Sequence, residues 1–258
     1  EQQLAEISFN NSKPDNYIFS TKLSFNSLNR RRSSKQDIFS TIDDVVFEKF
    51  GESSDKDKYI SPVMDMYFSK TFNAKHELTM NLVGTYYKSD YDYRYSELSG
   101  GVTDFETATN INLDKYSFIG EAVYNYNMKT AQLYVGSRYM YNNSTQKNLP
   151  SNNRTLTNEI YSYLGIAGML GKKFNYSVSA GVNGNIFTTI ENKEYKFVYF
   201  RPQVKLGYFI DESSDLTFNY EVNTENPAIS SLTYNPYFKD ANYLYVGNPN
   251  LKPSNNHD

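Results

Sequence analysis

The feature that most constrains this chain is a period-two alternation of apolar and polar side chains. Leu78, Met80 and Leu82, for example, alternate with Thr79 and Asn81. Successive side chains of a β-strand point to opposite faces, so the pattern predicts about ten antiparallel strands, each with one apolar and one polar face. The clearest lie in the ranges 17–25, 77–87, 116–126, 176–186, 202–210 and 216–222, and weaker ones in 5–9, 60–68, 131–141 and 161–170.

The predicted strands are long. Many cover roughly 9 to 12 residues, the length that a tilted strand needs to cross a bilayer, whereas soluble sandwiches use strands of about 5 or 6. The mean hydropathy of −0.66 is low, but a barrel that alternates lipid-facing and lumen-facing residues also has a low average. No segment approaches the roughly 18 apolar residues of a membrane helix. These lengths favour strands that span a membrane.

The connections between the strands alternate in length, which is a second and independent signal. Short turns on one side and long loops on the other are typical of outer-membrane barrels, with the turns in the periplasm and the loops outside the cell. The predicted short connections are 10–15, 70–76, 127–129, 171–175 and 211–215, and the predicted long ones are 26–58, 89–114, 142–158 and 224 onward, with a shorter exception at 189–194.

Charged residues occur on the polar faces of these strands: Glu121, Arg138, Arg201, Lys205 and Glu221. Inside a small barrel with a packed apolar core, such charges would be costly. In a wide, wet lumen they are solvated, so we expect these five residues to face the lumen and the apolar faces to contact lipid. The sequence therefore predicts an all-β fold, an antiparallel transmembrane outer-membrane β-barrel.

Aromatic residues are abundant, with 25 Tyr and 17 Phe but no Trp. Tyrosines near strand ends are expected to form girdles at the lipid headgroups, although tyrosine is also simply a good strand former. The residues concerned are Tyr86, Tyr87, Tyr91, Tyr124, Tyr126, Tyr139 and Tyr141.

A further set of aromatic residues is expected in the long extracellular loops. Their rings could stack on a flat ligand or a partner, and the alternative is that the loops pack on one another at the barrel mouth. These residues are Tyr91, Tyr93, Tyr95, Tyr237, Phe238, Tyr243 and Tyr245.

The sequence carries no pattern of enzyme chemistry. It has no cysteine, and its two histidines, His76 and His257, have no ligand or nucleophile pattern around them. Phosphate-binding, dinucleotide-binding and metalloprotease motifs are absent. The net charge of −3 offers no basic surface for nucleic acid. We therefore expect no enzyme activity, no cofactor and no metal site.

The run Gly247-Asn248-Pro249-Asn250-Leu251-Lys252-Pro253 resembles the GNPxLKPE signature of TonB-dependent outer-membrane receptors, especially those of the Bacteroidota. Ser254 stands where Glu is usual in that family. The segment 135–139 also looks like a GxRY strand of the same receptors. Within the motif loop, the residues that carry the match are Gly247, Asn248, Pro249, Leu251, Lys252 and Pro253.

The resemblance implies a barrel of 22 strands around an N-terminal plug. We expect residues 1–258 to form one partial barrel domain, with the plug and the remaining strands outside this chain. It implies the outer membrane of a Gram-negative bacterium, of Bacteroidota type. The expected partners are the bilayer and lipopolysaccharide, TonB through the plug, and a surface lipoprotein or other envelope subunits. Arg30–Arg32 could contact lipopolysaccharide phosphates, and the alternative is a solvated run of loop charges.

Three functions remain open at this point. The resemblance favours a receptor that takes up a scarce solute such as a siderophore, a glycan or a peptide. A structural or accessory barrel subunit of an envelope complex, or a passive pore, would have the same alternating strands. The sequence does not say which solute or partner is bound.

Overall fold

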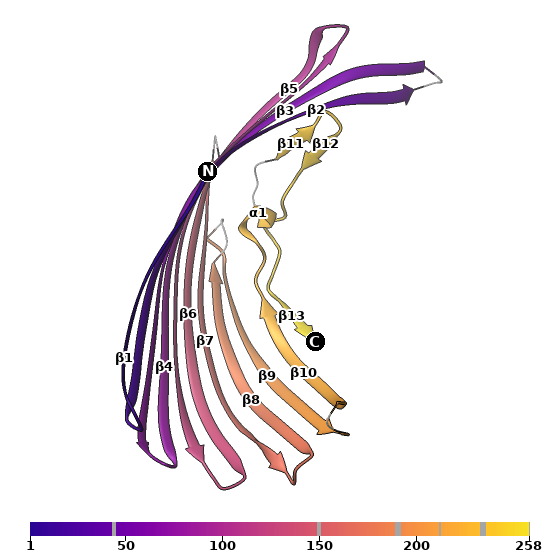
Figure 1. Ribbon diagram of the computed structural model, residues 1–258. Coiled ribbons are helices and arrows are strands. Elements are labelled where there is room, and N and C mark those ends of the chain that lie inside the picture. Colours follow the sequence, from indigo (N-terminus) through magenta and orange to yellow (C-terminus); the bar gives the residue numbers. More distant parts are fainter. Residues whose placement is uncertain (43–44, 149–150, 189–191, 212, 233–235, 258) are drawn as a thin grey trace.

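The main element of the computed structural model is an antiparallel sheet of 11 strands, ordered β1-β2-β3-β4-β5-β6-β7-β8-β9-β10-β13 (Figure 1). The structure describes all residues except 43–44, 149–150, 189–191, 212, 233–235 and 258. The strands are β1 (Gln2–Lys13), β2 (Tyr17–Ile42), β3 (Val45–Asn73), β4 (His76–Ser99), β5 (Val102–Asn127), β6 (Ala131–Asn148), β7 (Ser151–Leu170), β8 (Phe174–Thr188), β9 (Glu194–Phe209), β10 (Asp215–Glu225) and β13 (Ser254–His257).

Three short elements interrupt the long connection between β10 and β13. They are α1 (Ile229–Leu232) and the hairpin of β11 (Tyr237–Asp240) and β12 (Tyr243–Tyr245). Figure 1 shows that this connection lies on the concave side of the curved sheet. Leu232 of α1 is fully buried, and α1 contacts β7.

Register rows across the sheet show that one face is apolar. One row runs through Ile7, Leu23, Met64, Gly84, Phe118 and Tyr141, from β1 to β6. The adjacent row, on the opposite face, is mixed and carries Lys22, Asp65, Val83, Ile119 and Met140. Ile7 is 73% exposed and Leu164, on the same face of β7, is 66% exposed. A continuous exposed apolar surface of this kind suits lipid contact. We call it the outward face.

Five of the seven tyrosines predicted for the girdles lie on the outward face, although Tyr139 is in the mid-band row of Leu82 and Gly120. Tyr86 and Tyr116 are cross-strand neighbours whose ring centroids are 4.9 Å apart. Tyr124, Tyr126, Tyr139 and Tyr141 are also on the outward face by register. Tyr87 and Tyr91 are on the other face, and Tyr87 packs on Tyr59 there. The girdle expectation is therefore wrong for these two residues.

The described residues of the predicted long loops 26–58, 89–114 and 142–158 form paired strands, apart from the turn at Gly100 and Gly101. The register of β2 with β3 continues without interruption from Tyr17↔Lys70 to Ile42↔Val45. The sequence pattern missed these extensions because polar residues occupy both faces there, so no apolar alternation marks them. In the part of the chain that the structure describes, only the connection after β10 is long.

The extended parts of β2 to β5, residues 29–42, 45–58, 88–99 and 102–114, form what we call the wing. Strands of 24 to 29 residues reach about 80 to 95 Å, far more than the roughly 25 Å apolar band of a membrane barrel. Figure 1 shows the wing bending over the concave side, with β11 and β12 beneath it. The β4–β5 turn closes on Gly100 and Gly101, whose φ angles of 59° and 82° favour glycine.

The short turns lie where the sequence predicted them, at the end of the sheet opposite the wing. Because outer-membrane barrels carry their longer extensions outside the cell, we expect the wing to be extracellular. The strand β13 was not predicted, and it pairs with β10 from Glu225↔Ser254 to Val222↔His257. Among the described residues, β1 and β13 are the two edges of the sheet and do not pair with each other. No helix in the described part of the chain has the length and hydropathy needed to cross a membrane.

We predict that Leu82→Arg impairs assembly strongly, whereas Asn81→Arg, the adjacent change on the opposite face, does not. Leu82 is in the middle of the outward band, between Met66 and Gly120, and an arginine at the membrane midplane costs about 2 to 4 kcal/mol. Urea unfolding of both variants in lipid vesicles measures the difference. Equal losses of stability would contradict the assignment of the faces.

Candidate functional site

A cluster of charged and aromatic side chains occupies the concave face of β5 to β10. Arg138 of β6 reaches Glu159 of β7, with 3.2 Å between Nη2 and Oε1. Arg201 of β9 approaches the same carboxylate oxygen at 3.9 Å. The side chain of Glu159 is only 7% exposed, so these two guanidinium groups balance a buried negative charge.

Arg201 is the most connected residue of this cluster. Its Nε donates to the carbonyl oxygen of Val222 at 3.0 Å, and its Nη2 donates to Asn223 of β10. Its guanidinium carbon lies 4.6 Å from the ring centroid of Tyr161, an attractive cation–π arrangement. These contacts with β7 and β10, the strands that contribute Glu159, Tyr161, Val222 and Asn223, fix the position of the guanidinium group.

Two further carboxylates complete the cluster. Glu221 accepts hydrogen bonds of 2.7 Å from Gln203 and from Asn223. Glu121 accepts one of 2.8 Å from the hydroxyl of Tyr163. Each carboxylate thus accepts hydrogen bonds from neighbouring side chains. These bonds preorganise the charged groups of the wall.

Three tyrosines of this wall lie over glycines of the neighbouring strands. A Cβ atom on Gly181 would overlap the ring of Tyr161, and one on Gly136 would overlap the ring of Tyr163. Tyr134 covers Gly165 in the same way. Since only glycine leaves this space, the sequence of small residues on β6 to β8 sets the positions of the rings.

The cluster surrounds an open cavity of 530 Å³. Its lining includes Glu121, Arg138, Tyr161, Arg201 and Glu221. The cavity offers hydrogen-bond donors, acceptors and aromatic faces side by side. Such a surface suits a polar solute better than an apolar one.

Buried amides continue the polar surface beside this cavity. Asn183 of β8 is fully buried between its cross-strand neighbours Tyr161 and Tyr199, and neither of its side-chain polar atoms has a partner in the described part of the chain. Asn185 donates to Asn226 at 3.1 Å, but its oxygen is likewise unpaired. A buried unpaired polar atom costs about 1 to 3 kcal/mol, so this part of the wall would gain from an added polar partner.

A second, aromatic pocket of 400 Å³ lies between the wing and the β11–β12 hairpin. Tyr91 and Tyr93 stack with parallel rings, 6.5 Å between centroids and 8° between planes. Both line this pocket together with Tyr243 and Tyr245. The hydroxyl of Tyr93 donates to the carbonyl oxygen of Lys239 at 3.1 Å.

The remaining aromatic candidates are packing residues. Phe238 meets Phe105 edge-on at 5.7 Å, which joins the hairpin to the wing, and Tyr95 is 3% exposed. The side chain of Tyr237 lies outside the described part of the chain. Tyr91, Tyr93 and Tyr95 are on β4 rather than in a loop, whereas the other four are on β11 and β12, within the long connection predicted after residue 224.

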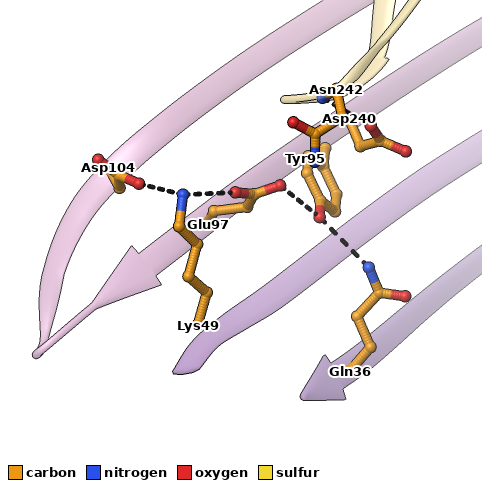
Figure 2. Close-up of polar contacts among 7 residues, drawn as sticks. All are labelled: Gln36, Lys49, Tyr95, Glu97, Asp104, Asp240 and Asn242. Carbon is orange, nitrogen blue, oxygen red and sulfur yellow. Dashed lines mark hydrogen bonds and ion pairs between the residues drawn. The ribbon is translucent and has the colours of Figure 1, made fainter. Parts of the chain in front are cut away.

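A polar network ties the wing together, as Figure 2 shows. Lys49 of β3 contacts both Glu97 of β4, at 3.3 Å, and Asp104 of β5. The hydroxyl of Tyr95 donates to Glu97 at 3.0 Å and accepts from Gln36 of β2 at 3.2 Å. Burial raises the pKa of Tyr95, so its hydroxyl stays protonated and can donate. The hydrogen bond to Asp104, followed by that to Glu97, raises the pKa of Lys49.

The motif loop anchors the connection between β12 and β13. Pro249 and Pro253 are buried. The backbone N–H of Asn248 donates to the carbonyl oxygen of Ser231 in α1 at 2.8 Å, and the ammonium group of Lys252 lies 5.9 Å from the ring centroid of Tyr195 on β9. Leu251 is 37% exposed. The loop is therefore fixed to the barrel wall just before the chain returns into β13.

The structure brings four of the five residues expected in the lumen into one cavity. The fifth, Lys205, is on the same face of β9, opposite Asn219, but is exposed and outside the lining. Sequence reasoning missed Glu159, Tyr161, Tyr163, Gln203 and Asn223. Their alternation with Ile160, Ser162 and Leu164 in β7 and with Val204 in β9 could have indicated that they belong to the polar face.

The last third of the chain, residues 171–258, matches a family model described as Outer membrane protein beta-barrel family. The fold is that of an outer-membrane β-barrel. The match covers β8 to β13, including the motif loop, and β1 to β7 extend the same sheet. It points to the outer membrane as the location of the protein. No curated protein matches the chain. Among the described residues, no group of three or more His, Asp or Glu side chains is placed to hold a metal ion.

We predict that Gly181→Ala destabilises the protein by about 1 to 3 kcal/mol, the usual cost of overpacking. The added methyl group would push Tyr161 away from Arg201. The matched control is Gly184→Ala on the outward face of the same strand, where the nearest atom, Cγ2 of Ile160, is 3.5 Å from the new Cβ. Urea midpoints in lipid vesicles compare the two, and equal midpoints would contradict the packing.

We predict that Lys49→Met speeds amide hydrogen exchange in the wing, because it leaves the buried carboxylate of Glu97 without its cation. Lys35→Met should change the exchange rate little, since both side chains of the Lys35–Glu52 ion pair are exposed to solvent. Because the folded-state pKa of Lys49 is raised, the stabilisation is complete below its unfolded pKa of about 10.4 and is lost as the pH rises through the folded value. Exchange that is already fast at pH 7 in the unmodified wing would contradict this.

Proposed function

We propose that this chain forms part of the barrel of a TonB-dependent outer-membrane receptor, which takes up a scarce polar solute. The observation that carries the proposal is the charged and tyrosine-lined concave wall of an open sheet. Eleven strands spaced about 4.8 Å apart give an arc of more than about 50 Å. A wall on which the half-buried Arg138 and the more buried Arg201 pair with the buried Glu159 suits a wide lumen rather than a packed core.

A wide lumen must be occluded, because an open channel of this diameter would let small solutes cross the membrane without control. We therefore propose that an N-terminal plug and further strands complete a barrel of 22 strands, and that TonB acts through the plug. The motif loop resembles the signature of such receptors, and the family match over residues 171–258 supports the outer-membrane part of the proposal. The pre-arranged Arg201 and Glu221 would then contact the solute or the plug.

The wing favours a second candidate, a barrel that docks another envelope protein. Its strands carry paired backbone far beyond the membrane band, and its concave side holds the Tyr91–Tyr93 stack. A surface lipoprotein resting on the wing would fit either a receptor complex or a structural subunit. Loss of the partner on deletion of the wing, with no effect on uptake, would favour the structural reading.

We predict that Arg201→Ala lowers energy-dependent uptake about tenfold at an unchanged surface level, which corresponds to the loss of one charged hydrogen bond. Lys205→Ala, on the same face of the same strand but outside the cavity lining, is the matched control. The assay is growth and solute depletion on panels of iron chelates, glycans and peptides, in cells with and without TonB. Growth that is independent of TonB, together with steady conductance of the purified barrel in planar bilayers, would show a passive pore instead.

A further inference from the structure

The concave face of β7 and β8 carries uncharged polar side chains that are buried, although this face points away from lipid. Thr157 of β7 is 4% exposed, and Asn183 and Asn185 of β8 are 0% and 1% exposed. The cross-strand pairs Glu159↔Asn185 and Tyr161↔Asn183 join this row to the charged cluster. The row is therefore a direct continuation of the cavity wall, but solvent does not reach it.

The segment over this row is 226–232, which includes α1 and which we call the strap. Figure 1 shows α1 on the concave side of the sheet, and α1 contacts β7. At the start of the strap, Asn226 accepts a hydrogen bond of 3.1 Å from Asn185. At its end Leu232 is 0% exposed, and Phe187, on the same face of β8, is 2% exposed. An apolar anchor and a hydrogen bond thus hold the strap against the wall.

The motif loop supports the strap from its other side. The backbone N–H of Asn248 donates to the carbonyl oxygen of Ser231 in α1 at 2.8 Å. The ammonium group of Lys193, just before β9, donates to the side-chain oxygen of Asn250 at 3.3 Å. The motif loop is therefore fixed to the β8–β9 connection and to α1 at the same time, and it keeps the strap in its covering position.

The covered amides do not have the hydrogen bonds that they can form. In the part of the chain that the structure describes, Oδ1 and Nδ2 of Asn183 and Oδ1 of Asn185 have no partner. A carboxamide offers an acceptor oxygen and two donor hydrogens, and leaving such groups unpaired in the interior is unfavourable. The covered state therefore carries a free-energy penalty that polar partners would remove.

The surroundings of these amides favour neutral partners. Arg138 and Arg201 already balance the carboxylate of Glu159. A charged group placed beside Asn183 would therefore lack a free counter-charge, and its burial would be costly. Hydroxyl and amide groups carry no net charge and can both donate to and accept from a carboxamide.

We propose that Asn183 and Asn185 form a second contact site, which binds neutral hydroxyl or amide groups of the solute, and that the strap covers this site until it lifts. Tyr161 lines the charged cavity and is the cross-strand neighbour of Asn183, so one solute molecule can reach both places. The identity of the ligand rests on the proposed uptake function. The cover and the unpaired amides can be measured without any transport.

The first test replaces the amide of Asn183 in the whole protein purified from its native membrane. Asn183→Leu keeps the branching of the side chain, and the smaller Asn183→Val guards against overpacking. At least one of them should raise the urea midpoint, because an unpaired buried amide is removed. Asn219→Leu, which replaces an exposed amide on the same face of β10, should leave it unchanged. A lower midpoint for both Asn183 variants would show a structural partner for the amide and would overturn the proposal.

The second test measures access to the covered row. This chain has no cysteine, so Thr157→Cys places a single thiol under the strap. The probe is 2-hydroxyethyl methanethiosulfonate, a small neutral hydroxyl compound, and Lys205→Cys on the exposed part of the face is the reference. Adding Leu232→Ala, which removes the anchor, should speed labelling at position 157 about tenfold or more. Leu251→Ala, at a side chain that is 37% exposed, should not. Equal labelling rates with and without the anchor would overturn the cover.

Uptake separates this site from the transport proposal. Both Asn183 variants should take up the solute about fivefold more slowly than the unmodified protein, as expected for the loss of one hydrogen bond. Uptake that depends on TonB and is unchanged in both variants would overturn the contact site and leave the transport proposal standing. If the unmodified protein takes up no solute, the transport proposal fails, and the urea and labelling results alone support or overturn the covered amide site.

Discussion

Continuous backbone pairing between neighbouring strands is the interaction on which the rest of this structure depends. In lipid, every N–H and C=O group must find its partner within the sheet, because no water is there to replace it. The chain meets this demand with antiparallel neighbours that follow one another in sequence from β1 to β10. Across the apolar band the register is regular and shifts only near strand ends, at Thr71/Asn73 and Glu97/Leu98. Each residue of the band is therefore assigned to one face, and both the lipid contact and the polar wall follow from that assignment.

The same backbone pairing continues beyond the lipid-facing band into the wing. Beyond the apolar band, β2 to β5 keep their register as the wing, where polar residues occupy both faces. There the sheet has no apolar core of its own and is held by networks such as Lys49, Glu97 and Tyr95. The β11–β12 hairpin packs beneath it through Phe105 and Phe238. The wing is therefore a paired extension of the sheet rather than a set of loops.

Glycines on the two faces of the sheet have different surroundings. On the concave face, glycines at 136, 165 and 181 make room for tyrosine rings, and those rings support Arg138 and Arg201. On the outward face, Gly84 has no ring over it, so it leaves a hollow. The cross-strand neighbour of Gly84, Phe118, is aromatic too, but its ring lies toward Gly120, so the direction of the neighbouring ring decides whether a glycine is covered.

The sequence by itself determined the strands that cross the membrane, the side of each strand that meets lipid, and the short turns. It could do so because a lipid-facing surface requires alternation, and alternation is visible in one dimension. It also marked Glu121, Arg138, Arg201 and Glu221 as residues of the polar face. Tertiary structure alone decided that 26–58 and 89–114 are strands, that Glu159 joins the two arginines, and that Tyr95 is buried. These features depend on cross-strand partners distant in sequence, and where both faces are polar no local pattern announces them.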